Sequence, residues 1–187
     1  MKALILSGSR NPTGQTAQAA QALAEGLTAG GGAAHVEYLP TFALERCRQC
    51  DAAGWGLCRS EGRCVIDDDF SALAERLRQA DVAVFATPVY FSDMSESLRA
   101  FTDRLRRVAR HDDGRRGLTE KPAVALCVAG GGGGGAPACA AIMEKTLRTI
   151  GFDLVDAVCV RRQNLAMKLD VLRATGSWLA GVGGDGL

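Results

Sequence analysis

The sequence lacks any long hydrophobic run. Apolar residues make up 47% of the 187 positions, yet no apolar stretch approaches the roughly 20 residues that a membrane-spanning helix needs. The first apolar run, Ala3–Leu6, is short and is broken at once by Ser7–Ser9, which is not the pattern of a secretory signal. These absences predict a cytoplasmic protein that does not engage a membrane.

An excess of charge of either sign is also missing. The chain has 22 Lys and Arg against 21 Asp and Glu, a formal net charge of +1. Such a chain has no overall field that would draw it to nucleic acid, so no nucleic-acid partner is expected. One local basic run is interpreted as a solvated helix end and loop, the alternative being a site for an anionic substrate or for nicotinamide nucleotide phosphates; it comprises Arg106, Arg107, Arg110, Arg115 and Arg116.

Histidine is scarce, and several common catalytic motifs are absent. The two histidines, His35 and His111, belong to no Ser-His-Asp or HExxH arrangement. No GxxxxGK[ST] motif is present, and no GxGxxG follows the first apolar run. These absences argue against a nucleoside-triphosphate loop and against a standard dinucleotide-binding loop.

What the sequence does contain is a regular alternation of strand and helix patterns. Short apolar runs, typical of strands buried on both faces, occupy Ala3–Leu6, His35–Leu39, Val82–Ala86, Ala123–Val128 and Leu154–Val160. Helical patterns separate or follow them at Pro12–Leu27, Phe70–Gln79, Ser95–Val108, Pro137–Ile150 and Ala166–Leu179. This order predicts an α/β fold, a doubly wound five-stranded parallel sheet with helices on both faces. Residues 1–187 are expected to form one domain.

Three loops of unusual composition follow the first, third and fourth strands, where ligands bind in such sheets. The first, Ser7–Thr16, combines hydroxyl groups with a helix N-terminus, a pairing that suits a phosphate; the alternative is a simple capped turn. The second, Thr87–Ser95, carries two aromatic residues that could stack on a planar ring or merely cover the sheet edge. The third contains the six glycines Gly130–Gly135, which favour close approach of backbone to a ligand, or a disordered surface loop.

Taken together, the segments GSRNPTGQT, TPVYFSDMSESLRAFTDR and AGGGGGG resemble the NADPH-dependent FMN reductase and iron-sulfur flavoprotein group of the flavodoxin-like superfamily. The resemblance implies strand order 2-1-3-4-5 and bound FMN. It implies phosphate contacts from Ser9, Arg10, Gly14, Gln15 and Thr16, where Gln15 replaces a common asparagine. It implies that Pro88, Val89, Tyr90 and Phe91 pack against the isoalloxazine and ribityl groups, and that Gly130, Gly131 and Gly132 lie beside the pyrimidine end of the ring.

The same resemblance implies an FMN-dependent NAD(P)H oxidoreductase of the flavin, quinone or small-molecule reductase type. The flavin would carry the redox chemistry, so no catalytic side chain is expected. NAD(P)H would be the electron donor, and a small molecule or a redox protein the acceptor. Family habit implies a homodimer or homotetramer.

Four of the seven cysteines lie within a short segment, Cys47-x2-Cys50-x7-Cys58-x5-Cys64. Four thiolates so placed could hold a 4Fe–4S cluster or a zinc ion, or could be plain reduced thiols. Iron-sulfur flavoproteins carry a compact cysteine motif at this location, after the second strand, but here Asp51–Leu57 widens the second gap. A Cys-rich insert of about residues 44–66 is therefore expected.

Depending on what the four cysteines bind, two alternative functions remain open. An occupied cluster would favour an iron-sulfur flavoprotein electron carrier that accepts electrons from a ferredoxin-like partner. A zinc ion would favour a zinc-stabilised binding module with a vestigial flavin site. The remaining cysteines, Cys127, Cys139 and Cys159, are interpreted as buried apolar thiols.

Overall fold

A five-stranded parallel sheet forms the centre of the molecule, which a computed structural model describes for residues 1–185, and for residues 1–181 including side chains. The strands are β1 (Lys2–Ser7), β2 (Ala33–Tyr38), β3 (Val82–Pro88), β4 (Pro122–Ala129) and β5 (Asp153–Arg161). Their order is β2-β1-β3-β4-β5, with every neighbouring pair parallel. The predicted sheet and strand order are confirmed.

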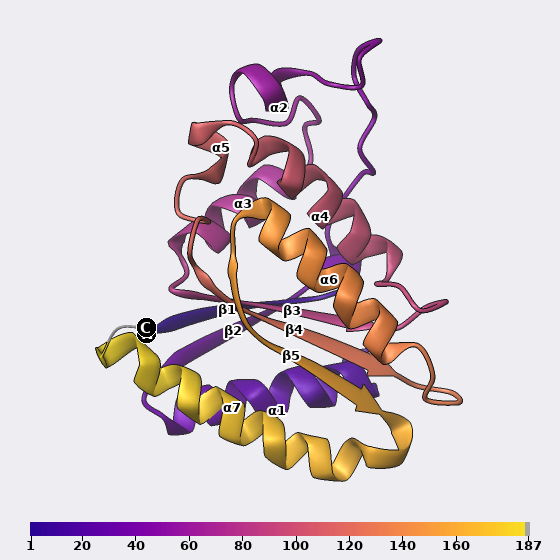
Figure 1. Cartoon of the computed structure of the whole chain (residues 1–187), viewed down its shortest axis with the longest axis vertical. Helices are drawn as coiled ribbons and strands as arrows, with labels where there is room; N and C mark the ends of the chain where they lie inside the picture. Colours follow the sequence, from indigo (N-terminus) through magenta and orange to yellow (C-terminus); the bar gives the residue numbers. More distant parts are fainter. Residues whose placement is uncertain (186–187) are drawn as a thin grey trace.

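Helices cover both faces of this sheet (Figure 1). The long helices are α1 (Gln15–Ala29), α3 (Phe70–Gln79), α4 (Glu96–Val108), α6 (Ala136–Ile150) and α7 (Leu165–Asp185). Short helical turns are η1 (Leu39–Thr41), α2 (Leu57–Ser60), α5 (Asp112–Arg115) and η2 (Arg162–Asn164). The last helix extends beyond the predicted end at Leu179, as far as Asp185.

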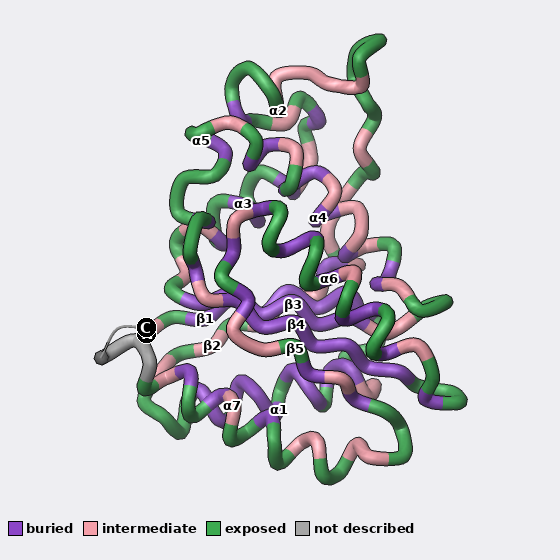
Figure 2. Tube along the Cα trace, in the orientation of Figure 1, coloured by how far each residue is buried: buried purple, intermediate pink, exposed green. Residues whose placement is uncertain are grey.

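The central strands are buried along most of their length (Figure 2). Successive residues of one strand face different layers: Leu4 packs with the α3, α4 and α6 side, whereas Ile5 packs with the α1 and α7 side. Burial on both faces explains why these strands read as continuous apolar runs rather than as alternating patterns. The arrangement leaves the carboxyl ends of β1, β3 and β4 at one edge.

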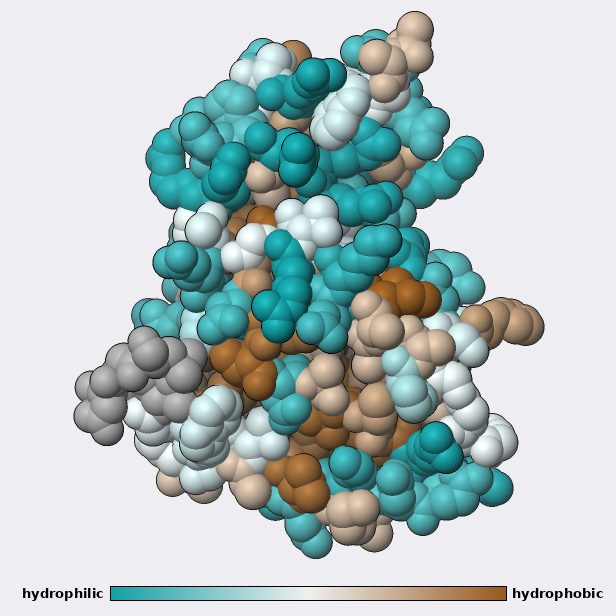
Figure 3. All heavy atoms as spheres, in the orientation of Figure 1, coloured by the Kyte–Doolittle hydropathy of each residue, from teal (hydrophilic) through white to brown (hydrophobic). Residues whose placement is uncertain are grey.

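The predicted Cys-rich insert lies between η1 and α3. All residues of this segment are described by the structure, and its only helix is the short α2. Figure 1 places it beyond α4, away from the sheet, and Figure 3 shows mainly hydrophilic side chains around α2 and α5. With so little regular structure of its own, this segment depends on contacts with α3 and α4.

A buried ion pair fastens the insert to α4. The guanidinium of Arg104 donates to both oxygens of Asp68, at 2.6 and 2.8 Å, and to the carbonyl of Glu45 at 3.1 Å. It also lies over the ring of Phe70, 4.2 Å from the ring centre. The side chains of Arg104 and Asp68 are only 1% and 5% exposed. Burial alone would raise the pKa of Asp68, but hydrogen bonds from Arg104 and from two backbone N–H groups outweigh it and lower that pKa.

Three consecutive aspartates, Asp67–Asp69, immediately precede α3, where a carboxylate can cap the helix. Asp68 does so in part, because its Oδ1 accepts the backbone N–H of Phe70 at 3.1 Å. Asp69 instead turns back to the start of the insert and accepts the N–H of Ala43 at 2.7 Å. The carboxylates therefore close the insert at both ends as well as starting the helix.

Candidate functional site

A cavity of ≈ 530 Å³ opens at the carboxyl edge of the sheet, within the size range of small-molecule sites. Its walls come from the loops after β1, β3 and β4, as predicted. The lining residues are Ser9, Gln15, Thr16, Pro88, Val89, Tyr90, Val128, Ala129, Gly130, Gly131, Gly132, Gly133 and Gly134. Nine of the twelve predicted cofactor residues are thus brought together, whereas Arg10, Gly14 and Phe91 do not line the cavity.

The loop after β1 delivers the N-terminus of α1 to this cavity. The N–H of Gly8 donates to the carbonyl of Ala86 on β3 at 2.8 Å, which fixes the start of the loop. Gly14 is the N-cap residue of α1, and no side chain caps the helix there. The first turn of α1 therefore has no side-chain cap, and its residues Gln15 and Thr16 line the cavity, an arrangement that suits an anion.

The side-chain oxygen of Gln15 is buried but accepts no hydrogen bond from the described residues. Its Oε1 has no hydrogen-bond partner among the described residues, although the residue lines the cavity. A buried acceptor left without a donor is unfavourable, and native structures seldom retain one without a reason. FMN fits this requirement, since its ribityl hydroxyls and its ring N–H are donors.

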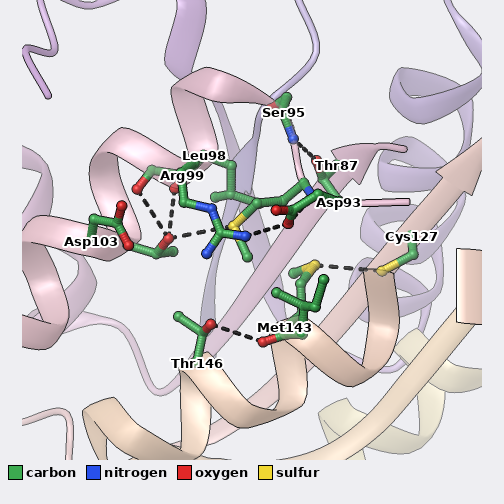
Figure 4. A network of polar contacts seen from close by, with 12 residues as sticks. Thr87, Asp93, Ser95, Leu98, Arg99, Asp103, Cys127, Met143 and Thr146 are labelled. Carbon is green, nitrogen blue, oxygen red and sulfur yellow. Dashed lines mark hydrogen bonds and ion pairs between the residues drawn. The ribbon is translucent and has the colours of Figure 1, made fainter. Parts of the chain in front are cut away.

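The loop after β3 forms a short hairpin that is closed by hydrogen bonds and an ion pair. The Ser95 N–H donates to Thr87 Oγ1 at 2.8 Å, and Asp93 forms an ion pair with Arg99 (Figure 4). Tyr90 and Asp93 exchange two backbone hydrogen bonds of 2.9 Å. Phe91, at the tip, has a φ of +49° and a fully exposed side chain. The hairpin therefore presents Tyr90 to the cavity and directs Phe91 to solvent, a division that composition alone did not reveal.

The glycine loop after β4 is ordered and forms the third wall. The N–H of Gly133 donates to the carbonyl of Gly130 at 2.7 Å, closing a turn. A Cβ placed on Gly131, Gly132 or Gly134 would meet no atom within 4 Å, so bare backbone borders open space there. Without side chains in the way, the backbone of this loop can approach a ligand closely. The lining also includes Gly133 and Gly134, which the prediction omitted.

The four cysteines of the insert line one small cavity of ≈ 20 Å³, together with Trp55 and Arg104. They therefore gather in one region, as the sequence predicted. Within residues 1–181, however, no three Cys, His, Asp or Glu side chains are grouped closely enough to hold a metal ion. As placed here, the cysteines do not fit a cluster or a zinc ion.

The remaining cysteines are packing residues. Cys127 and Cys139 are fully buried, and Cys127 Sγ lies 3.4 Å from Met143 Sδ (Figure 4). A hydrogen bond with Cys139, together with burial, raises the pKa of Cys127. Cys159 faces Cys127 across β4 and β5 and is half-buried, and burial raises its pKa as well. Raised pKa values disfavour the nucleophilic thiolate at Cys127 and Cys159.

The fold is that of a flavodoxin-like α/β protein, with a cavity at the carboxyl edge of its sheet. The solved NAD(P)H:quinone oxidoreductase from Methanothermobacter marburgensis shares this fold, with a TM-score of 0.70, 20% sequence identity and 96% coverage of both chains. The sequence model of the NADPH-dependent FMN reductase family matches residues 1–170. The chain therefore belongs to this family.

Two curated relatives are similar in sequence. An iron-sulfur flavoprotein of Methanosarcina thermophila is 33% identical over 104 residues, covering 56% of this chain and 47% of that protein. A Bacillus subtilis protein, provisionally named an NAD(P)H-dependent FMN-containing oxidoreductase, is 29% identical over 133 residues, covering 70% and 67%. The chain spans about half the length of the iron-sulfur flavoproteins it matches, 46% to 52%. None of the helices in the described residues has the length and hydrophobicity to cross a bilayer.

Proposed function

We propose that this protein binds FMN in the cavity at the carboxyl edge of the sheet and is an NAD(P)H-dependent FMN oxidoreductase that reduces a small molecule. The observation that carries the proposal is the junction of an uncapped helix N-terminus, the orphaned Gln15 oxygen and a bare glycine backbone around one cavity. FMN would supply a partner to each of them: an anionic phosphate to the helix N-terminus, a hydrogen-bond donor to the Gln15 oxygen, and a surface that packs against the glycine backbone.

The chain's residues would divide the cofactor among three loops. The α1 N-terminus, with Ser9 and Thr16, would hold the phosphate, while Pro88, Val89 and Tyr90 would contact the planar ring. When bound, FMN supplies the electron-transfer chemistry. Within the described cavity lining, no residue is acidic, a histidine, a lysine or a cysteine. The protein's contribution is accordingly binding, orientation and exclusion of water rather than a catalytic side chain.

Partner, location and assembly complete the proposal. The electron acceptor is a small molecule, with a redox protein as the alternative, and the chain works as a cytoplasmic homodimer or homotetramer. Residues 1–187 form one domain. The family assignment and the names of the relatives support the redox role.

Ligand titration tests the proposal directly. Purified protein should take up FMN at micromolar concentration, and reduced nicotinamide nucleotide should bleach the bound flavin under anaerobic conditions. Thr16→Ala should weaken FMN by about 1–2 kcal/mol if its hydroxyl bonds the phosphate, and should weaken riboflavin, which has no phosphate, much less. Thr28→Ala, at the far end of α1, is the matched control. Failure to bind FMN, or equal losses for FMN and riboflavin, would contradict the proposed site.

The alternative electron-carrier function is favoured by two observations, the iron-sulfur flavoprotein relatives and the four cysteines around one cavity. It requires a cluster, which the present placement of the cysteines does not form. Iron and acid-labile sulfide assays on anaerobically purified protein separate the two functions. Stoichiometric iron and sulfide would support the carrier, stoichiometric zinc would support a zinc-stabilised module, and the absence of metal would support the oxidoreductase alone.

A further inference from the structure

Most arginines in this protein already have a partner. Of eighteen, eleven pair with carboxylates, namely Arg48, Arg63, Arg76, Arg78, Arg99, Arg104, Arg106, Arg115, Arg116, Arg148 and Arg173. Arg59 and Arg107 lie over the ring of Trp55. The basic run noted in the sequence is thus largely satisfied by its own neighbours, and it does not border the cavity.

Five arginines contact neither a carboxylate nor the Trp55 ring among the described residues, and they are unevenly distributed. They are Arg10, Arg46, Arg110, Arg161 and Arg162. Arg10 belongs to the loop after β1, while Arg161 ends β5 and Arg162 begins η2. Three of the five therefore lie at the carboxyl edge of the sheet, on the segments that surround the cavity.

Sheet register places Arg161 beside the cavity wall. Arg161 on β5 is paired with Ala129 on β4, and Ala129 lines the cavity immediately before the glycine loop. Arg161 is exposed, and its backbone N–H donates to Asn164 Oδ1 at 2.7 Å. That bond fixes the turn that carries both arginines.

A side-chain contact ties the same turn to the glycine loop. Gln163 Nε2 donates to the carbonyl of Gly132 at 3.1 Å. A Cβ on Gly133 would lie only 2.2 Å from Gln163 Oε1, so the amide sits against the loop backbone. In Figure 1 the β5–α7 turn accordingly lies beside the β4–α6 loop. The turn that carries Arg161 and Arg162 is thereby held next to a wall of the cavity.

We propose that Arg161 and Arg162 bind the 2′-phosphate of NADPH and make the protein select NADPH over NADH. The inference rests on the proposed function, because the nucleotide must meet the flavin in this cavity. A phosphate monoester carries nearly two negative charges at neutral pH, and arginine is suited to bind it through two parallel hydrogen bonds. The α1 N-terminus, with Ser9 and Thr16, would bind the FMN phosphate, so Arg161 and Arg162 would supply the second anion site that a phosphorylated dinucleotide needs.

Steady-state kinetics with NADPH and with NADH tests the proposal. In the FMN-loaded protein, the double variant Arg161→Gln/Arg162→Gln should lose about tenfold or more in kcat/KM for NADPH, and should change less than about twofold for NADH. FMN affinity should be unchanged. Arg110→Gln, which removes an equally exposed arginine remote from the cavity, should alter neither nucleotide. Equal losses for both nucleotides, no loss, or the same loss in Arg110→Gln would overturn the assignment.

A binding measurement separates this inference from the proposed function. Calorimetric titration of the FMN-loaded protein should show that 2′,5′-ADP binds more tightly than 5′-ADP, and that the double variant abolishes the difference. If the wild type shows this preference but oxidises neither nucleotide, the proposed oxidoreductase fails while the phosphate site stands. If the wild type oxidises both nucleotides and binds both analogues equally, the phosphate site fails while the oxidoreductase stands.

Discussion

At the scale of single residues, Gln15 is where ligand binding and folding stability oppose each other. Without FMN its Oε1 is a buried acceptor with no donor, and removing it should relieve the folded protein. Gln15→Met should therefore stabilise the ligand-free protein by about 1 kcal/mol, measured by urea unfolding. The same change should weaken FMN by about 1 kcal/mol, measured by fluorescence titration.

The control is Gln21→Met, the same substitution on an exposed position of the same helix. It should leave FMN affinity unchanged, and any effect on stability reports the helix propensity of methionine alone. A Gln15→Met protein that is destabilised and binds FMN normally would show that the side chain is structural and that its oxygen does not contact the ligand.

Arg104 and Asp68 illustrate a second residue-scale effect, the mutual dependence of buried charges. Asp68→Asn should destabilise the fold by about 3–5 kcal/mol, because it leaves the Arg104 charge without compensation. Asp68 has a folded-state pKa below its unfolded value, which is about 3.9. Its stabilisation is therefore complete above that pH and is lost as the pH falls through the folded-state pKa.

Chemical unfolding at several pH values measures this contribution. The wild type should lose stability below about pH 4 more steeply than Asp68→Asn. The double variant Asp68→Leu/Arg104→Met, which removes both charges, should be more stable than Asp68→Asn. If Asp68→Asn costs less than the exposed-pair variant Glu144→Gln, whose partner is Arg148, the buried pair does not anchor the insert.

At the scale of elements, the sequence predicted the strands well for a physical reason. Val82–Ala86 and Ala123–Val128 are buried on both faces, so their apolar runs are continuous and easy to recognise. The partners of buried charges could not be predicted in this way. Nothing in the sequence separates Arg104, which is buried, from Arg106, which is exposed, because only the packing of α4 against the insert distinguishes them.

A small number of contacts attach the insert to α4. Arg107 donates to the Gly54 carbonyl at 2.6 Å, and its guanidinium lies 5.0 Å from the Trp55 ring centre. Trp55→Ala should therefore release the insert from α4 while leaving the sheet intact. Limited trypsin digestion should cut faster after Arg46, Arg48 and Arg59. FMN affinity should not change, because none of these residues lines the cavity proposed to bind FMN.

A suitable control is Trp178→Ala, which removes a half-exposed tryptophan from α7 and should not alter cleavage in the insert. Accelerated cleavage throughout the chain in Trp55→Ala would mean global destabilisation rather than local release. Unchanged cleavage would mean that Arg104 and Asp68 hold the insert without help from the aromatic contact.

At the scale of the whole molecule, the candidate site exists only when the sheet is assembled. The three loops come from positions far apart in the sequence, and parallel strands in the observed order bring their carboxyl ends to one edge. This is why the sequence could predict which loops lie together at that edge. Arg161 and Arg162 escaped notice because their nearness to the glycine loop depends on strand register and on the Gln163 contact.

Because the site is assembled by folding, ligand binding should stabilise the whole fold. The unfolded chain has no such cavity, so FMN at 100 times its dissociation constant should add about 2.7 kcal/mol to the free energy of unfolding. Thermal unfolding monitored by circular dichroism should show a midpoint that rises with FMN concentration. Thr16→Ala should need a higher FMN concentration for the same rise, whereas Thr28→Ala should follow the wild type. A midpoint independent of FMN would mean that the cavity does not bind the cofactor, whatever the family of the chain.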